Sequence, residues 1–219
     1  TYIIQSQSTD NAGNIETDGN GNTFTVDSQI PVSSVTNPIN GVTINSLTTI
    51  SGNSSDNLSG ISLVQIAIYN ASTDQYYNGS IWVTGIQWLN ATGTGNWTYT
   101  APGFTNGNAY NIKSRATDTA GNVETPGSGN GFNFDTAAPS SVVTYPTNNS
   151  NLKTLTTISG TASDNFTLNK VQVAIRNMTD SNYWQGGIWG AALVWNDATG
   201  TTNWTYSAPA FMRSSRMPL

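Results

Sequence analysis

The sequence predicts an all-β fold made of tandem β-sandwich domains, the first and last of them incomplete. Three observations support this class. Apolar residues occur in short runs that alternate with polar ones, turn residues separate these runs, and the pattern returns after 108 positions, so that Thr9 to Thr17 matches Thr117 to Thr125. A period of this length corresponds to a whole small domain rather than to one unit of a solenoid. We therefore expect an array of similar domains.

The repeat also predicts where these domains begin and end. Residues 28–135 correspond to one complete repeat, residues 1–27 to the last strands of a preceding copy, and residues 136–211 to the first three quarters of a following one. Residues 212–219 follow no repeat pattern, and we interpret them as a tail outside the fold. The sequence alone leaves open whether the incomplete ends are biological.

Composition is typical of an extracellular β protein. Only 9% of the residues are charged, 10% are aromatic, and the chain contains no Cys and no His. The aromatic content and the repeat length are sufficient for a proper core, and zero Cys excludes a disulfide scaffold. A net charge of −5 without a basic stripe argues against a nucleic-acid partner. No apolar run reaches the length of about 18 residues expected for a membrane span.

The complete repeat contains about seven strand-like segments. The first is expected to be split around Asn37-Pro38, and the third shows the clearest alternation of apolar and polar residues. The expected strands cover residues 31–36 with 41–44, 48–54, 64–68, 96–100, 110–116 and a last strand that holds Phe132 and Phe134. In the third repeat Val171, Val173 and Ile175 predict the same third strand, and Phe24 and Val26 correspond to the last strand in the first copy.

Several motifs together resemble the bacterial immunoglobulin-like (Ig-like) repeats of large extracellular surface proteins. They are Ile-Ser-Gly-x-x-Ser-Asp-Asn from Ile50, Tyr-x-Ile-x-Ser-x-Ala-Thr-Asp-x-Ala-Gly-Asn from Tyr110, and Phe-Asp-Thr-x-x-Pro from Phe134. The resemblance covers nearly all of residues 1–211 and implies Greek-key sandwiches of about seven strands. It also implies that Tyr110 is a tyrosine-corner residue, with Tyr2 as its counterpart. The chain departs from the common pattern by an enlarged aromatic segment between residues 76 and 97.

Ig-like topology predicts that three acidic loops meet, which makes calcium one candidate there. The entry to the first strand, the loop after the second strand and the loop after the sixth strand meet at one end of such a domain, which would bring together Asp27, Asp56 with Asn57, and Asp118 with Asn122. Close carboxylates repel one another unless a hard dication such as calcium binds them. The alternative is that these residues only cap turns. The corresponding residues of the third repeat are Asp135, Asp164 and Asn165, and its third loop is missing.

Recurring tryptophans offer a second candidate surface. Trp82 and Trp88 return as Trp189 and Trp195, and flat aromatic faces of this kind stack on sugars. The favoured interpretation is packing inside the sandwich, and polysaccharide binding is the alternative. Asn-x-Ser/Thr sequons permit N-glycosylation at ten positions: Asn53, Asn57, Asn70, Asn78, Asn90, Asn96, Asn148, Asn165, Asn177 and Asn203.

Catalysis is not expected, because the chain lacks His and Cys and its acidic residues recur in every copy instead of forming one cleft. The favoured function is a spacer or stalk of an extracellular or cell-surface adhesin, joined to neighbouring repeats and stiffened by calcium. The alternatives are a carbohydrate-binding module and a filament subunit. In the latter, residues 1–27 of one chain would complete residues 136–211 of another by strand addition, giving a homopolymer.

Overall fold

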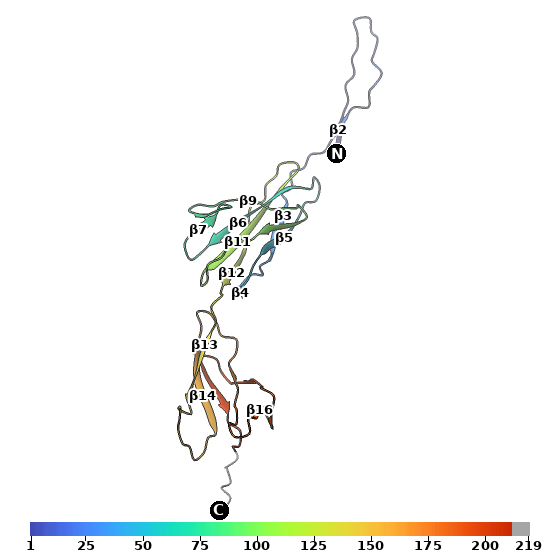
Figure 1. Cartoon of the computed structure of the whole chain (residues 1–219). Helices are drawn as coiled ribbons and strands as arrows, with labels where there is room; N and C mark the ends of the chain where they lie inside the picture. Colours follow the sequence, from blue (N-terminus) through green and yellow to red (C-terminus); the bar gives the residue numbers. More distant parts are fainter. Residues whose placement is uncertain (212–219) are drawn as a thin grey trace, which may run out of the picture. The chain divides into compact units, whose positions relative to one another are not determined.

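The computed structural model describes residues 1–211, and the predicted tail at 212–219 lies outside these described residues. The chain divides into two compact units, residues 1–135 (unit 1) and residues 136–219 (unit 2) (Figure 1). Throughout the described residues the secondary structure is β, so no helix in this part could cross a membrane.

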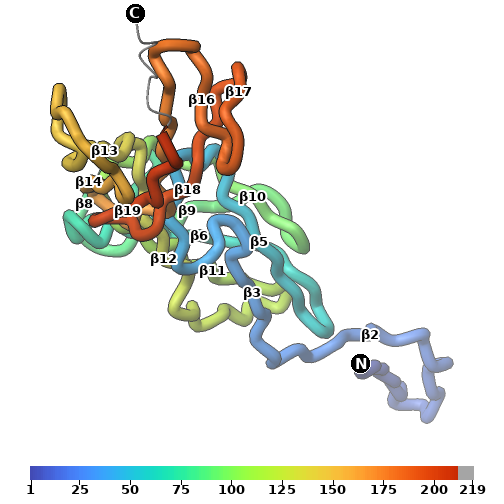
Figure 2. Tube along the Cα trace, turned by 90° about the horizontal axis from the view of Figure 1, so that it is seen from below, coloured from blue at the N-terminus to red at the C-terminus, as the bar shows by residue number. Residues whose placement is uncertain are grey.

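Unit 1 holds a β-sandwich preceded by a β-hairpin. The hairpin consists of β1 (Tyr2–Ile4) and β2 (Asn22–Phe24), paired antiparallel. One sheet of the sandwich has the order β10-β5-β3, and the other has the order β4-β12-β11-β6-β7-β8 with β9 also paired to β6. The bounds are β3 (Val32–Asn37), β4 (Val42–Ile44), β5 (Thr49–Ser55), β6 (Ile61–Asn70), β7 (Gln75–Tyr77), β8 (Trp82–Val83), β9 (Leu89–Asn90), β10 (Asn96–Thr100), β11 (Ala109–Asp118) and β12 (Asn130–Phe134). Figure 2 shows β3 beside β5.

The core of this sandwich comes from the residues whose alternation predicted strands. Val64, Ile66 and Ile68 of β6 are fully buried, and they pack with Trp97 of β10 and Ile112 of β11. Polar side chains occupy the intervening positions of β11, where buried and half-buried residues alternate along the strand. Each expected strand of the complete repeat is present within three residues of its predicted bounds, which confirms the all-β sandwich class.

Tyr110 makes the tyrosine-corner contact that the resemblance implies. Its ring is 2% exposed, and its hydroxyl accepts a hydrogen bond from the backbone N–H of Thr105 at 2.8 Å. Rings of Phe104, Phe132 and Trp82 surround it, with centroids 4.7, 5.4 and 5.6 Å away. This tyrosine therefore closes one end of the core.

Unit 2 repeats the first part of this architecture, as far as the counterpart of β10. Its strands are β13 (Ser140–Tyr145), β14 (Thr157–Ser163), β15 (Gln172–Val173), β16 (Tyr183–Trp184), β17 (Trp189–Gly190), β18 (Asn196–Asp197) and β19 (Asn203–Ser207). The sheet β13-β14-β19 matches β3-β5-β10. Val171, Val173 and Ile175 were expected to span a full strand, but only the two residues of β15 are paired as strand. The counterpart β6 is held along its length by β11, and residues 136–211 contain no counterpart of β11.

Candidate functional site

Three loops of unit 1 bring three aspartates together. Asp27 precedes β3, Asp56 follows β5, and Asp118 ends β11. One carboxylate oxygen of each lies within 4.8 Å of those of the other two. Asp118 is 1% exposed, and the other two are half-buried. The convergence inferred from the topology is therefore present in the structure.

Asp56 is held by its own loop. Its Oδ2 atom accepts hydrogen bonds from the backbone N–H groups of Leu58, Ser59 and Gly60 at 2.9 to 3.0 Å. The hydrogen bond from Leu58 is the largest cause of a pKa for Asp56 that lies below its ordinary value, so the group is a carboxylate at neutral pH. Its Oδ1 atom is buried and has no hydrogen-bond partner. A buried charged oxygen without a partner is costly, and a cation would stabilise it.

Asn122 links the other two aspartates. Its side-chain amide donates to Oδ2 of Asp118 at 2.8 Å and to the backbone oxygen of Asp27 at 3.1 Å. Burial raises the pKa of Asp118, but the hydrogen bonds from Asn122 and Gly121 together outweigh this effect and leave that pKa below its ordinary value. Asp27 in turn accepts a hydrogen bond from the backbone N–H of Ser59 at 3.0 Å. The three loops are therefore tied together through polar contacts.

The N-terminal hairpin contains the same Asp-Asn turn without a cluster of carboxylates. Asp10 and Asn14 are the counterparts of Asp118 and Asn122, and they make the same bonds: Asn14 donates its backbone N–H to Oδ1 of Asp10 and its side-chain amide to Oδ2. Asp10 does not belong to the group of three carboxylates found among residues 1–211. The Asp-Asn turn thus forms by itself, and turn capping explains its internal bonds. It does not explain why Asp27 and Asp56 converge on Asp118.

The donor set suits a hard cation. Carboxylate oxygens of Asp27, Asp56 and Asp118, with backbone oxygens of the same loops, are the ligand type that calcium prefers, and no softer donor is available because the chain has no His or Cys. Asn57 is exposed and lies outside the three-carboxylate cluster.

The third-repeat residues are only partly assembled. Asp164 accepts a hydrogen bond from the backbone N–H of Phe166 through Oδ2, while its Oδ1 is buried without a partner, as in Asp56. Asn165 is exposed. Asp135 ends unit 1 and donates its backbone N–H to the oxygen of Ile44. Within the described residues, neither aspartate belongs to a group of three.

The four tryptophans differ in their surroundings. Trp82 is half-buried between Tyr77 and Tyr110. Trp88 is covered by Arg115, whose guanidinium lies 4.2 Å from the ring centroid. Trp189 contacts Trp184 at 5.6 Å between ring centroids, and Trp195 is 58% exposed. Packing accounts for Trp82 and Trp88, and sugar binding stays a prediction.

Most sequons are accessible. Eight of the ten asparagines are exposed, Asn177 is half-buried, and Asn70 is 4% exposed. The side-chain oxygen of Asn70 accepts a hydrogen bond from the backbone N–H of Ser72. A glycan could therefore reach Asn70 only before the domain folds.

Glu124 is a structural residue that the sequence analysis did not single out. Its carboxylate accepts hydrogen bonds from the backbone N–H of Ala116, the backbone N–H of Ser33 and the hydroxyl of Ser33. It therefore fastens the loop after β11 to the first strand of the opposite sheet. The recurrence of this residue as Glu16 within the repeated motif was a signal, but Ser33 is 91 positions away in sequence.

A family model of known proteins matches part of the chain. Residues 139–215 match the family model of the bacterial Ig domain. This segment, which makes up most of unit 2, is similar to a bacterial Ig domain. Bacterial Ig domains are typical of extracellular and surface proteins and are typically non-catalytic. Among solved structures, the chain is similar to fibronectin(III)-like modules of Clostridium thermocellum CbhA, with 14% identity, 82% of this chain and 80% of that chain covered, and a TM-score of 0.37. A search of curated proteins gave no match.

Proposed function

We propose that this chain is a spacer segment of an extracellular repeat protein and that calcium stiffens the entry to each complete domain. The carrying observation is the group of three carboxylates around Asp27, the residue that leads from the hairpin into β3. Asp27 contacts both other loops through Ser59 and Asn122. An ion held there would restrain the short connection between residues 27 and 31.

Electrostatics supports calcium over an ion-free cluster. Asp56 and Asp118 both have lowered pKa values, the first mainly through its bond from Leu58 and the second through bonds from Asn122 and Gly121 that together outweigh its burial. Both are therefore charged at neutral pH, and their mutual repulsion is a cost that a divalent ion would remove. Binding to the folded state alone would add about 2.7 kcal/mol of stability at an ion concentration 100 times the dissociation constant.

The test is thermal unfolding of the full chain in calcium and in chelator, with Asp56→Asn as the variant. An asparagine retains an oxygen for the backbone bonds from Leu58, Ser59 and Gly60 but loses the charge of the unpartnered atom. We expect calcium to raise the Tm of the wild type and to leave the Tm of Asp56→Asn nearly unchanged.

Asp10→Asn is the control, because Asp10 makes the turn bonds of its counterpart Asp118 but has no neighbouring carboxylates in the cluster. Its calcium response should equal that of the wild type. Limited proteolysis reports on stiffness: calcium should slow cleavage between residues 27 and 31. An unchanged wild-type Tm and cleavage rate in saturating calcium would contradict the proposal and leave the aspartates as turn caps.

A further inference from the structure

The complete domain has a groove at the free edge of β10. It has a volume of about 400 Å³ and lies between β10, the turn that follows β7 and the segment that follows β9. Small-molecule sites typically have volumes of about 300–1,000 Å³. The groove is therefore large enough for a small ligand, and every residue that lines it belongs to the complete repeat. These residues are Tyr77, Gly79, Asn90, Thr92, Thr98, Tyr99, Thr100, Ala101 and Pro102.

The groove exists because β10 is an edge strand. One side of β10 pairs with β5, and on the other side Thr98 exchanges two backbone hydrogen bonds with Thr92, at 2.8 and 2.9 Å. Alternate residues of an antiparallel strand point their backbone groups to the same side, so those of Thr100 point away from β5 as those of Thr98 do. Among residues 1–211, no strand pairs with Thr100 on this side. Its N–H and C=O groups are therefore available to a ligand.

Two tyrosines supply the aromatic part of the groove. Tyr77 of β7 and Tyr99 of β10 belong to different sheets, are half-buried and pack against the core. Burial, with a smaller effect of Tyr77, raises the pKa of Tyr99, so its hydroxyl is protonated at neutral pH. The two residues thus offer a ligand both ring surface and hydroxyl groups that donate and accept hydrogen bonds.

Unit 2 keeps this arrangement of aromatic residues. Trp184 and Tyr206 are the counterparts of Tyr77 and Tyr99, and the indole N–H of Trp184 donates to the hydroxyl of Tyr206 at 2.9 Å. The bridge between Thr92 and Thr98 also returns, between Thr199 and Thr205. Both domains therefore place an aromatic pair beside a threonine bridge. Asn90, in contrast, corresponds to Asp197, which lies 3.6 Å from Lys170, so the uncharged lining belongs to the complete domain.

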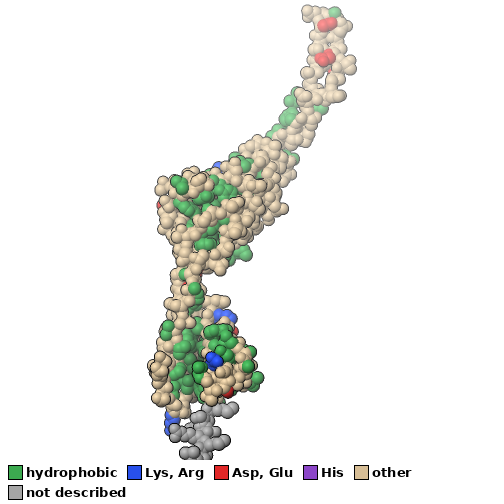
Figure 3. Space-filling model, in the orientation of Figure 1, with side chains coloured by type: hydrophobic (Ala, Val, Ile, Leu, Met, Phe, Trp, Pro, Cys, Tyr) green, Lys and Arg blue, Asp and Glu red, His purple; other side chains and the backbone are tan. Residues whose placement is uncertain are grey.

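The lining indicates the class of ligand. Asn90 and the threonines contribute amide and hydroxyl groups, and none of the described residues that line the groove is Asp, Glu, Lys or Arg. Figure 3 shows that charged side chains are also sparse on the visible face of this sandwich. An anionic ligand would need a cationic partner, and a lipid chain would leave these polar groups unpaired. A sugar ring has a C–H face that packs on aromatic rings and hydroxyl groups at its edge, so an uncharged saccharide fits.

A peptide strand fits this edge less well. Strand addition needs a run of free backbone N–H and C=O groups. Thr92 already occupies the edge at Thr98, and Pro102, two residues after Thr100, has no N–H to donate. The free edge is therefore too short for a strand, although it can bond to one or two hydroxyl groups.

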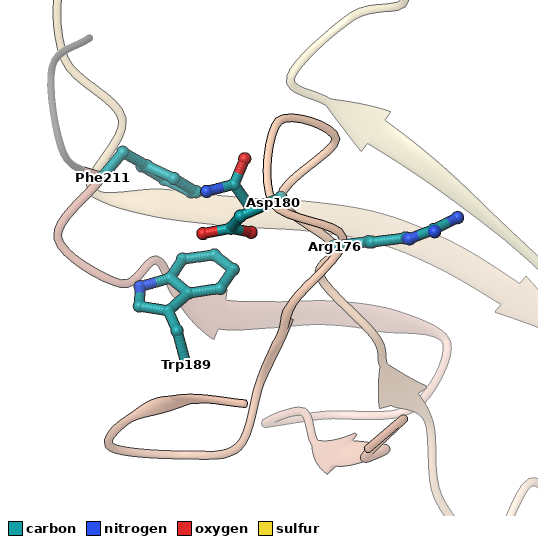
Figure 4. Close-up of a pocket in the computed structure, with 5 residues that line it drawn as sticks. Arg176, Asp180, Trp189 and Phe211 are labelled. Atoms are coloured by element: carbon teal, nitrogen blue, oxygen red, sulfur yellow. The ribbon is translucent and has the colours of Figure 1, made fainter. Parts of the chain in front are cut away.

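A smaller pocket in unit 2 has a different explanation. It has a volume of about 150 Å³, and Figure 4 shows Trp189 and Phe211 beside it. The counterparts of these rings in the complete domain are Trp82 and Phe104, which both pack against Tyr110. The pocket thus corresponds to the position of a core tyrosine, and it is not a ligand site of the repeat.

We propose that the complete domain binds an uncharged oligosaccharide in the groove at the edge of β10. One sugar ring packs against Tyr77 and Tyr99, and its hydroxyl groups bond to Asn90, Thr98 and the backbone of Thr100. This site is separate from Trp82, which packs against the core, and from Trp88, which Arg115 covers. It is also separate from the three aspartates, so binding needs no calcium. In an array, one such groove in each complete repeat would bind a polysaccharide at several points and raise the overall affinity.

The first experiment is a nuclear magnetic resonance titration of the full chain in chelator, so that failure of the calcium proposal does not affect it. The chain is made in a host that attaches no N-glycans, because a glycan on Asn90 would cover the groove. Cellotetraose, chitotetraose and mannotetraose are the uncharged probes, and tetragalacturonate is the charged one. We expect an uncharged probe to shift the amide resonances of Thr92, Thr98 and Thr100, and the charged probe to leave them unchanged.

Three results of this titration would overturn the proposal. The first is the absence of a shift with every uncharged probe at millimolar concentration. The second is a set of shifts centred on the indole of Trp88, which would place the sugar on the other surface. The third is an equal response to tetragalacturonate, which would contradict an uncharged ligand.

The second experiment measures the Kd of the tetrasaccharide that gives these shifts, by calorimetry on variants. Tyr77→Ala should weaken binding at least about tenfold, the effect of losing about 1.4 kcal/mol at a stacking ring. Thr98→Ala removes an exposed hydroxyl without touching the core and should weaken binding about threefold. Thr49→Ala, at an exposed threonine of the neighbouring strand β5, is the matched control and should bind as the wild type does. Equal Kd values for the wild type and Thr98→Ala, or equal losses in Thr98→Ala and Thr49→Ala, would contradict the site even if Tyr77→Ala failed to fold.

Discussion

The indole of Trp97 lies directly on the backbone of Gly52 in the paired strand β5 of the same sheet. A Cβ atom added to Gly52 would sit 2.5 Å from Cε2 of Trp97 and would also overlap the backbone oxygen of Ser34. Gly160 and Trp204 repeat this relationship in unit 2. The glycine of the Ile-Ser-Gly motif is therefore required by a close approach of backbone and ring, and it needs no unusual backbone angle.

Gly52→Ala should destabilise the complete domain by about 1–3 kcal/mol, because the ring and the strand must move apart to admit the methyl group. Chemical denaturation followed by tryptophan fluorescence measures the change. Gly127→Ala is the control, since nothing lies within 4 Å of a Cβ at that position. Equal midpoints for the two variants would mean that the core relaxes around Gly52 freely.

Glu124→Gln should lower the stability of the complete domain by about 1–3 kcal/mol, the usual cost of weakening hydrogen bonds to a charged group. The amide cannot accept all the bonds that the carboxylate takes from Ser33 and Ala116. Glu16→Gln changes the same motif in the hairpin, where Glu16 bonds to Ser8 and makes no contact equivalent to that of Glu124 with Ser33. The unfolding midpoint of this variant, measured in chelator at low protein concentration, should therefore match the wild type. Hydrogen exchange at the Ser33 amide gives a local readout, and unchanged protection there would argue against the role of Glu124.

Arg115→Ala should expose Trp88. The guanidinium lies over the indole and also donates two hydrogen bonds to Gln65, so its loss should cost about 1 kcal/mol and leave the ring open to solvent. Acrylamide quenching of tryptophan fluorescence should rise. Lys113→Ala, on the same strand, is the control. Were quenching the same in both variants, Trp88 would already be open in solution, and the sugar-binding alternative would gain support.

Tyr110→Phe should reduce the free energy of unfolding by about 1 kcal/mol through loss of the bond from the Thr105 amide, while the ring packing with Phe104 and Phe132 remains. Tyr2→Phe removes a hydroxyl from the hairpin copy and should have no effect at low protein concentration. A similar stability of Tyr110→Phe and wild type would show that water replaces the corner bond.

Much of the fold is predictable from the sequence because the signals are local. The strand at Asn96–Thr100 is found at its predicted residues, and the alternation of Val64, Ile66 and Ile68 identifies the core face. The strand predicted from Val171 to Ile175 is shorter than expected, since a strand forms only with a partner and residue pattern alone does not reveal whether one is present.

The candidate site was predictable only through topology. Asp27, Asp56 and Asp118 are far apart in sequence, and the order of strands in an Ig-like sandwich is what places their loops at one end. Which atoms face the cluster could not be predicted: Asn57 is exposed, whereas Asn122 bridges two aspartates. Contacts such as Glu124 with Ser33 depend on how the two sheets pack against each other, and this packing could not be predicted from the sequence pattern.

The autonomy of the hairpin bears on how such a chain folds. Its contacts are local, with Tyr2 and Phe24 separated by 22 positions, so its loop closes quickly and hairpins of this kind form in about 1–10 μs. We expect the docking of a finished hairpin onto the earlier strands to be slower than the formation of the hairpin. In an array of near-identical domains, misassembly should swap whole hairpins between neighbouring domains. Sequence differences between adjacent hairpins would protect against such swapping.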